Sequence, residues 1–227
     1  MGDRFRKPFG GLISRSQLLD VRVQGAYFKA AARHGGAIPG LTVDRFSVAT
    51  ARNKVVAEAL TYGQGVDSVW FCDADVLVPD DALELMAQVD APVVSALVPI
   101  FHRRPGQPSH FYWNVAEQMN GRERVRWHTE QFDDVRQVDG CGAGCVLIDL
   151  DVFRLVEFPW FELTERLDNP TSQGGRYVVR GEDMNFCERL QKLDLKIMAH
   201  GGVVCGHLNE VNLLDVLQTR IAQETMQ

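Results

Sequence analysis

Apolar residues recur with two different periods along the chain. At 16–33 and 47–62 they return every third or fourth position, which predicts two helices. Continuous apolar runs at 66–72, 91–98 and 145–150 predict buried strands, because a strand covered on both faces has no polar side. We expect Leu18, Leu19, Val23, Phe28 and Ala32 to be buried in the first helix, and Val48, Ala51, Val55, Ala59 and Tyr62 in the second.

Later segments show weaker patterns. A helix is predicted to open at Pro79, with acidic residues in its first turn. Prolines, aromatic residues and basic clusters in 99–135 indicate a long active-site connection with short strands, whereas 157–181 looks irregular, with a hinge at Gly174 and Gly175. An amphipathic helix at 182–193, with Met184, Cys187, Leu190 and Leu193 on one side, a strand at 195–199 and a helix at 209–224 complete the prediction.

The order of these elements predicts the fold. Alternating helices and strands favour a parallel sheet covered by helices. No linker divides the chain, and its 227 residues suit one domain with a sizeable core. We therefore expect an α/β fold, a single domain over residues 1–227 with a mainly parallel central sheet flanked by helices.

Composition and charge narrow the classes of function. Hydrophobic residues make up 45% of the chain and charged residues 24%, and the formal net charge is −6, so general electrostatic attraction to nucleic acid or anionic membranes is not expected. No apolar run approaches the ~20 residues of a membrane helix, and residues 1–9 lack the apolar stretch of a secretory signal. The five cysteines, an odd number, indicate reduced thiols. We expect a cytoplasmic protein without membrane insertion, in the host cytoplasm if it is phage-encoded.

Two carboxylates follow the strand predicted at 66–72. Asp73 and Asp75 stand where a buried strand ends, and ligands of open α/β sheets bind at that end. Hard divalent cations such as Mg²⁺ are typically held by one or two carboxylates together with substrate phosphates. Solvated acids that cap a strand would show the same pattern, so this pair alone does not decide between the two interpretations.

Further candidate groups lie along the chain. Glu182 and Asp183 open a predicted helix, where acids stabilise the helix dipole by ~0.3–1 kcal/mol and where a general base would also be well presented. His207 follows a strand-like run and a glycine, which favours a place near the same sheet edge. Arg103 belongs to a basic cluster directly after a predicted strand, and we expect it where substrates bind.

The order of the motifs resembles the GT-A glycosyltransferases. Ala51-Arg52-Asn53 is followed by Asp73-Ala74-Asp75 after a hydrophobic strand, and then by Gly142-Ala143-Gly144, Glu182-Asp183 and Gly206-His207. The similarity is greatest to family 2-like enzymes, including small ones in bacteriophage and bacterial genomes, and covers roughly residues 41–210. Each motif is weak alone, but together, in order and in the expected structural settings, they are much more specific.

The resemblance implies metal-dependent transfer of a sugar from a nucleotide-diphosphate donor to an acceptor hydroxyl, by an inverting reaction. It implies Mn²⁺ or Mg²⁺ bound by Asp75 and His207, with Asp73 facing the ribose or the water shell of the metal. Asp183 matches the base that activates the acceptor, with Glu182 as the alternate. The nucleotide-sugar contacts it implies are Arg52, Asn53, Asp73, Ala74, Gly142, Ala143 and Gly144, to which Arg103 is added from its position after a strand.

The sequence departs from the family at its start. GT-A enzymes usually begin with a hydrophobic strand whose following loop holds the nucleotide base. Only residues 10–14 match that strand here, so we expect either a shortened strand or another mode of base recognition. The sugar, the base, the oligomeric state and the acceptor, whether protein, modified nucleic acid, glycan or small molecule, stay open.

Other interpretations compete with glycosyl transfer. Residues 71–76 also resemble the first motif of haloacid dehalogenase-like phosphatases, with Asp73 as nucleophile, although that motif normally lies on the first strand. Residues 140–144 lack the spacing of a dinucleotide-binding loop. An inactive sugar-nucleotide-binding protein on the same scaffold is the non-enzyme alternative. A zinc site would use Cys141, Cys145, Cys205 and His207, which have no recognised zinc spacing.

Overall fold

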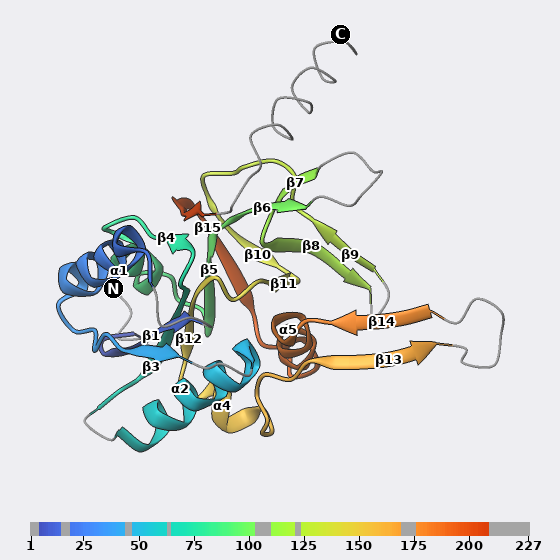
Figure 1. Cartoon of the computed structure of the whole chain (residues 1–227), viewed down its shortest axis with the longest axis horizontal. Helices are drawn as coiled ribbons and strands as arrows, with labels where there is room; N and C mark the ends of the chain where they lie inside the picture. Colours follow the sequence, from blue (N-terminus) through green and yellow to red (C-terminus); the bar gives the residue numbers. More distant parts are fainter. Residues whose placement is uncertain are drawn as a thin grey trace, which may run out of the picture.

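A seven-stranded sheet forms the centre of the molecule (Figure 1). Its strands, in spatial order, are β10 (Val135–Val138), β15 (Ile197–Val204), β5 (Val93–Leu97), β12 (Cys145–Asp149), β3 (Ser68–Asp73), β1 (Pro8–Ser14) and β2 (Leu41–Val43). The computed structural model describes residues 5–14, 19–43, 47–62, 65–102, 110–120, 124–168 and 176–208.

Parallel pairing accounts for only part of this sheet. β1 is parallel to β2 and β3, and β15 is parallel to β5. β12 lies between β5 and β3 and is antiparallel to both, and β10 is antiparallel to β15. The predicted α/β fold is confirmed, whereas the sheet is mixed. The reason is that the chain reaches β12 through the strand-rich connection after β5 instead of a crossover helix.

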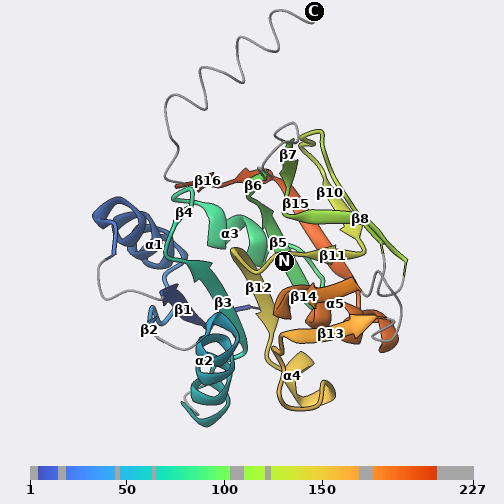
Figure 2. The same ribbon diagram turned by 45° about the vertical axis from the view of Figure 1, so that its right-hand side comes forward.

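Helices cover both faces of the sheet (Figures 1 and 2). On β3, Val69 and Phe71 face one hydrophobic core and Trp70 and Cys72 face the other, which explains the continuous apolar run of this strand. No helix in the described part of the chain is long and apolar enough to span a membrane. One core contains residues of α2 (Val48–Tyr62), α4 (Val152–Leu155) and α5 (Glu182–Lys192), and the other contains residues of α1 (Val21–His34) and α3 (Ala82–Ala87).

The rotation of α1 differs from the prediction. Its Tyr27 ring stacks on Trp70, with ring centroids 4.8 Å apart, and this contact turns Phe28 and Ala32 toward solvent. Predicted burial of those two residues is therefore wrong, because the sheet packs against the neighbouring stripe of the helix. Tyr62 and Leu193, also predicted to face the core, are exposed, and Leu18 lies outside the described residues.

The first strand is complete. All seven residues of β1 are buried, and β1 lies between β3 and β2. A Cβ on Gly10 would lie 2.1 Å from the Tyr27 hydroxyl oxygen, and one on Gly11 would lie 2.8 Å from Val55. These glycines weaken the strand pattern in the sequence because α1 and α2 pack directly on the strand backbone. The alternative of a shortened first strand is therefore wrong.

Small sheets and hairpins surround the central sheet. Short strands lie within the connection predicted at 99–135, as expected. The region 157–181 is not simply irregular, because it contains a hairpin that extends away from the sheet beside α5 (Figure 1). The predicted hinge glycines, Gly174 and Gly175, and the helix at 209–224 lie outside the described residues. The paired strands are β6 (Pro99–His102) with β7 (His110–Trp113), β8 (Val115–Asn120) with β9 (Arg124–Trp127) and β11 (Gly140–Cys141), β4 (Val76–Leu77) with β16 (Gly206–His207), and β13 (Thr164–Asp168) with β14 (Arg176–Arg180).

Candidate functional site

A cavity of about 210 Å³ lies at the carboxyl end of β3. Residues from each of the predicted motifs line it, although these motifs are spread over more than 150 positions of the sequence. This is the end of an α/β sheet at which ligands usually bind. The motif residues that line the cavity are Arg52, Asp73, Gly142, Ala143, Gly144, Glu182, Asp183 and His207.

Arg52 connects three of these motifs. Its side chain is on the buried face of α2 and is only 3% exposed. Nη2 donates to Oδ1 of Asp73 over 2.8 Å, and Nη1 donates to Oε1 of Glu182. Nη2 also lies 3.5 Å from the carbonyl oxygen of Ala143. This buried cation holds both carboxylates in position, because moving a carboxylate away would leave buried charge without compensation.

The adjacent acids at the start of α5 have different partners. Glu182 is ion-paired with Arg52, whereas Asp183 accepts a hydrogen bond from the backbone N–H of Met184 over 2.7 Å. Burial and the nearby charge of Glu182 raise the pKa of Asp183, although Arg52 opposes the shift. A carboxylate with a raised pKa and no ion pair among the described residues is the better proton acceptor of the two.

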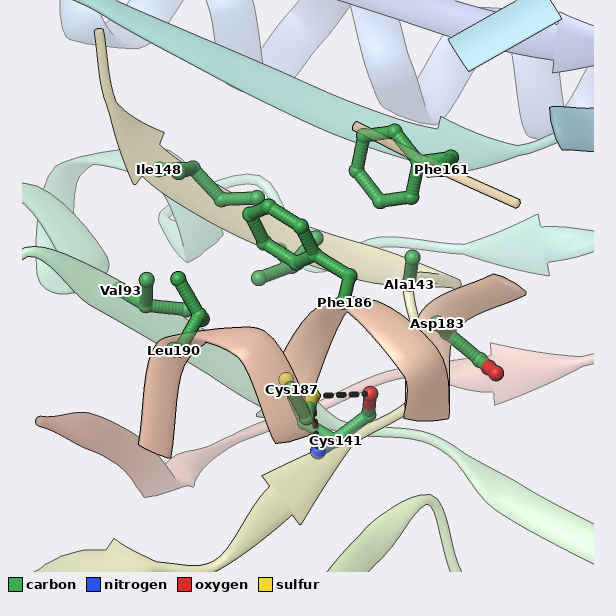
Figure 3. Close-up of a pocket in the computed structure, with 10 residues that line it drawn as sticks. Val93, Cys141, Ala143, Ile148, Phe161, Asp183, Phe186, Cys187 and Leu190 are labelled. Carbon is green, nitrogen blue, oxygen red and sulfur yellow. Dashed lines mark hydrogen bonds between the residues drawn. The ribbon is translucent and has the colours of Figure 1, made fainter. Parts of the chain in front are cut away.

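Apolar residues behind Asp183 explain its desolvation. Figure 3 shows the carboxylate of Asp183 at the start of α5, directed away from a group of apolar side chains that includes Ile148, Phe186 and Leu190. The space among them is a cavity of about 10 Å³, at the lower limit of what one water molecule needs. Asp183 therefore has an apolar wall on one side and the larger cavity on the other.

Backbone pairing brings His207 beside Asp75. β16 is antiparallel to β4, and the N–H of Leu208 donates to the carbonyl oxygen of Asp75 over 2.7 Å. Nε2 of His207 lies 3.5 Å from Oδ2 of Asp75. Nδ1 lies 2.8 Å from the carbonyl oxygen of Pro99, which can only accept, so Nδ1 carries the proton. The nearby carboxylate of Asp75 raises the pKa of His207, because it favours the protonated ring, and burial opposes this shift.

The donor set at Asp75 and His207 fits a divalent metal. Carboxylate oxygens suit Mg²⁺ and Mn²⁺, and histidine is the commonest metal-ligating side chain. A ligating histidine almost always donates its other N–H to a carboxylate, a backbone carbonyl or water, as His207 does to the carbonyl of Pro99. Within the described residues no three His, Cys, Asp or Glu side chains are arranged to hold a metal ion. A metal here would therefore need oxygen atoms from a phosphate or from water as well.

Neither Gly142 nor Gly144 is required by the packing of the protein around it. Neither has a positive φ, and a Cβ on either would lie 3.4 Å or more from its neighbours, an ordinary contact distance. By contrast, a Cβ on Gly140 would lie 2.3 Å from the sulfur of Met119. Gly140 thus allows Met119 to pack closely against the backbone, while the side chains absent at positions 142 and 144 enlarge the cavity.

Two predicted contact residues do not line the cavity, and a third cannot be compared with it. The side chain of Asn53 makes two hydrogen bonds with the backbone of Phe161. Nδ2 of Asn53 donates to the Phe161 carbonyl oxygen over 2.8 Å, and Oδ1 accepts from the Phe161 N–H over 3.0 Å. Its amide is thereby used within the protein, away from the cavity. Ala74 is in a turn and donates its N–H to the carbonyl oxygen of Ile13. Arg103 lies outside the described residues.

Asn114 lines the cavity, and no motif in the sequence points to it. It is 3% exposed and lies between β7 and β8. A polar residue in an aromatic-rich segment was the only available signal, and such residues are common in connections.

The zinc alternative fails on the positions of the cysteines. Cys141 packs in the core on one face of the sheet with Cys187, whereas Cys145 and Cys205 pack in the core on the other face. All five cysteines are buried free thiols, which agrees with the expectation of reduced cysteines. The sheet therefore separates the proposed ligands.

The comparison with known proteins supports the fold. No family model and no curated protein matches the sequence. Among solved structures, A197 from STIV matches with a TM-score of 0.58 and 16% identity over 90% of this chain and 86% of that chain. GalNAc-T7, solved with UDP, GalNAc and Mn²⁺, matches with a TM-score of 0.51 and 11% identity over 89% of this chain and 37% of that chain. At these identities the likeness shows a GT-A-like fold and no more.

Proposed function

We propose that this protein is a metal-dependent, inverting glycosyltransferase that uses a nucleotide-diphosphate sugar. The observation that carries the proposal is that each motif group contributes a residue to one cavity. His207, which lies beside Asp75, lines this cavity together with the desolvated carboxylate of Asp183. The GT-A-like fold supports it, and so does the neighbour GalNAc-T7, which was solved with a nucleotide and Mn²⁺. The family 2-like motif order in the sequence supports it independently.

The acidic residues of the cavity favour the binding of a cation, which must be present for a diphosphate to bind. Asp73, Glu182 and Asp183 line it, Arg52 is the basic residue paired with two of them, and Asp75 lies beside His207. Asp75 and His207 would hold Mn²⁺ or Mg²⁺, which when bound neutralises negative charge on the leaving nucleotide diphosphate. Burial and the neighbouring acids raise the pKa of Asp73 against the effect of Arg52, so added positive charge near it is favourable.

The other residues of the cavity have separate roles in the proposed reaction. The space at Gly142 and Gly144 accommodates the donor sugar next to Asp183. Asp183 takes the proton from the acceptor hydroxyl as that oxygen attacks the anomeric carbon and the bond to the diphosphate breaks. A raised pKa makes the carboxylate a stronger base than an exposed aspartate. Glu182 forms an ion pair with Arg52 and holds the start of α5 in place.

Metal-dependent binding of a nucleoside diphosphate tests this assignment. We expect calorimetry to show binding with Mn²⁺ and little in chelator. Asp75→Ala and His207→Ala should each weaken binding at least ~10-fold with little change in melting temperature. Asp80→Ala, which removes an exposed acid after the same strand, is the matched control and should bind normally. Equal affinity in chelator would refute the metal role.

Two further measurements separate the competing functions. Binding with no cleavage of any nucleotide sugar would favour an inactive binding protein. Hydrolysis of a simple phosphomonoester that is lost in Asp73→Asn would favour the phosphatase.

A further inference from the structure

We infer that Asn114 is a positioning residue, which holds the Gly142–Gly144 turn against the base Asp183 and thereby controls the rate of sugar transfer. This inference rests on the proposed function, since it assigns Asn114 a role in that same reaction. The residue is 3% exposed, lines the cavity, and belongs to none of the motifs found in the sequence.

Asn114 makes reciprocal hydrogen bonds with two other segments. Toward Val98, its backbone N–H donates to the carbonyl oxygen over 2.9 Å, and its Oδ1 accepts from the N–H over 2.8 Å. Toward Gly142, its carbonyl oxygen accepts from the N–H over 2.7 Å, and its Nδ2 donates to the carbonyl oxygen over 3.3 Å. Nδ2 also lies 3.4 Å from Oγ of Ser95. The amide therefore has a partner for its oxygen and for its nitrogen.

These bonds fix one end of the turn, and Asp73 fixes the other. The N–H of Asp73 donates to the carbonyl oxygen of Gly144 over 2.9 Å. Gly142 lies between Asn114 and Asp183, because a Cβ built on it would be 3.4 Å from Cβ of Asn114 and 3.5 Å from Oδ2 of Asp183. The Gly144 end thus faces the metal side of the cavity, and the Gly142 end faces the base. Loosening Asn114 would move the reacting end and leave the diphosphate end in place.

Asn114→Asp removes the side-chain hydrogen bond to the turn and keeps the one with Val98. The carboxylate can still accept from the N–H of Val98, but it cannot donate to Gly142 and places a charged oxygen against that carbonyl. Misplacement by about 1 Å can lower a rate by on the order of 100-fold. We expect kcat at saturating donor to fall ~10–100-fold, with the Kd for a nucleoside diphosphate and Mn²⁺ changed by less than ~3-fold.

Ser95→Ala provides the matched control. It removes the other partner of the same Nδ2, which belongs to β5 and not to the turn, and should lower stability without lowering kcat. An Asn114→Asp enzyme that folds, binds the nucleoside diphosphate and retains wild-type kcat would refute the inference. A kcat loss shared equally by Ser95→Ala would also refute it, because the effect would then be general destabilisation.

Hydrogen exchange of the wild-type amides decides the matter if the variant does not fold. The N–H groups of Gly142 and Val98 should exchange as slowly as those of the central strand β12. Rapid exchange at Val98, whose N–H donates to the side-chain oxygen of Asn114, would contradict the inference. Failure of the proposed function gives a different result: a wild-type protein that cleaves no nucleotide sugar while its Gly142 amide is protected.

Discussion

Asp183→Asn and Glu182→Gln should have opposite effects, although the two acids are adjacent. Asp183 has no ion pair among the described residues, and its Oδ1 accepts from Met184 N–H, a bond that an asparagine oxygen can keep. An amide cannot take a proton at neutral pH. We therefore expect Asp183→Asn to bind donor and metal normally and to lose at least ~100-fold in kcat, since a general base contributes ~10²–10⁴-fold.

The stability of Asp183→Asn follows from the direction of its pKa shift. The pKa of Asp183 is raised in the folded protein, mainly by burial, so the folded state favours the protonated form. Its ionised form therefore lowers stability once pH rises through the folded pKa, and this cost is absent below the unfolded pKa. At pH 7 the asparagine variant should melt at the same temperature as the wild type or higher, and the difference should vanish in acid.

Glu182→Gln removes the charge from one of the two carboxylates that hold buried Arg52. A hydrogen bond to a charged group contributes about 1.5–3 kcal/mol, which for a protein of this size corresponds to a Tm lowered by about 3–12 °C. Its kcat should fall much less than that of Asp183→Asn. Steady-state kinetics and thermal melts on both variants test the pair. If the rate loss follows Glu182 instead, the two roles are exchanged; if neither variant slows transfer, an inverting reaction with a base here is refuted.

Three other predictions follow from the site. The kcat at saturating donor and metal should fall at low pH with an apparent pKa above the ~3.9 of an ordinary aspartate, because protonated Asp183 cannot act as a base; a lower apparent pKa would contradict this. Gly142→Ala should fold normally and raise the donor KM, whereas Gly140→Ala should lower Tm and leave the donor KM unchanged. An unchanged KM in Gly142→Ala would show that the sugar lies elsewhere. Asn53→Ala should lower Tm, because it frees the backbone of Phe161, and should leave donor affinity unchanged; calorimetry would reveal a direct contact as weaker binding.

Local patterns in the sequence predicted the elements that pack in the simplest way. The strand before Asp73 is buried on both faces, so its apolar run is continuous and easily recognised. Periodicity could not reveal which stripe of α1 faces the sheet, because that choice depends on the stacking of Tyr27 on Trp70, 43 positions away. The first strand was obscured for a similar reason: its glycines are needed only because helices pack on them.

Residues of the candidate site were predictable from the sequence where they belong to a short recognisable motif. Adjacent helix positions point in different directions, so Arg52 enters the cavity and Asn53 does not, although the motif names both. The pairing of Arg52 with Glu182 joins positions 130 apart, and Asn114 acts through backbone groups of distant segments. Such contacts arise from the tertiary fold and leave no local pattern.

Cleavage of nucleotide sugars tests the central claim most directly. The protein would be incubated with a panel of nucleotide-diphosphate sugars, in Mn²⁺ and in chelator, and the released nucleoside diphosphate and free sugar would be measured. Our account predicts that at least one donor is cleaved in Mn²⁺ and spared in chelator, and that Asp75→Ala abolishes the reaction while Asp80→Ala does not. Cleavage that is indifferent to chelator and to Asp75, or no cleavage of any donor by the folded protein, would contradict it.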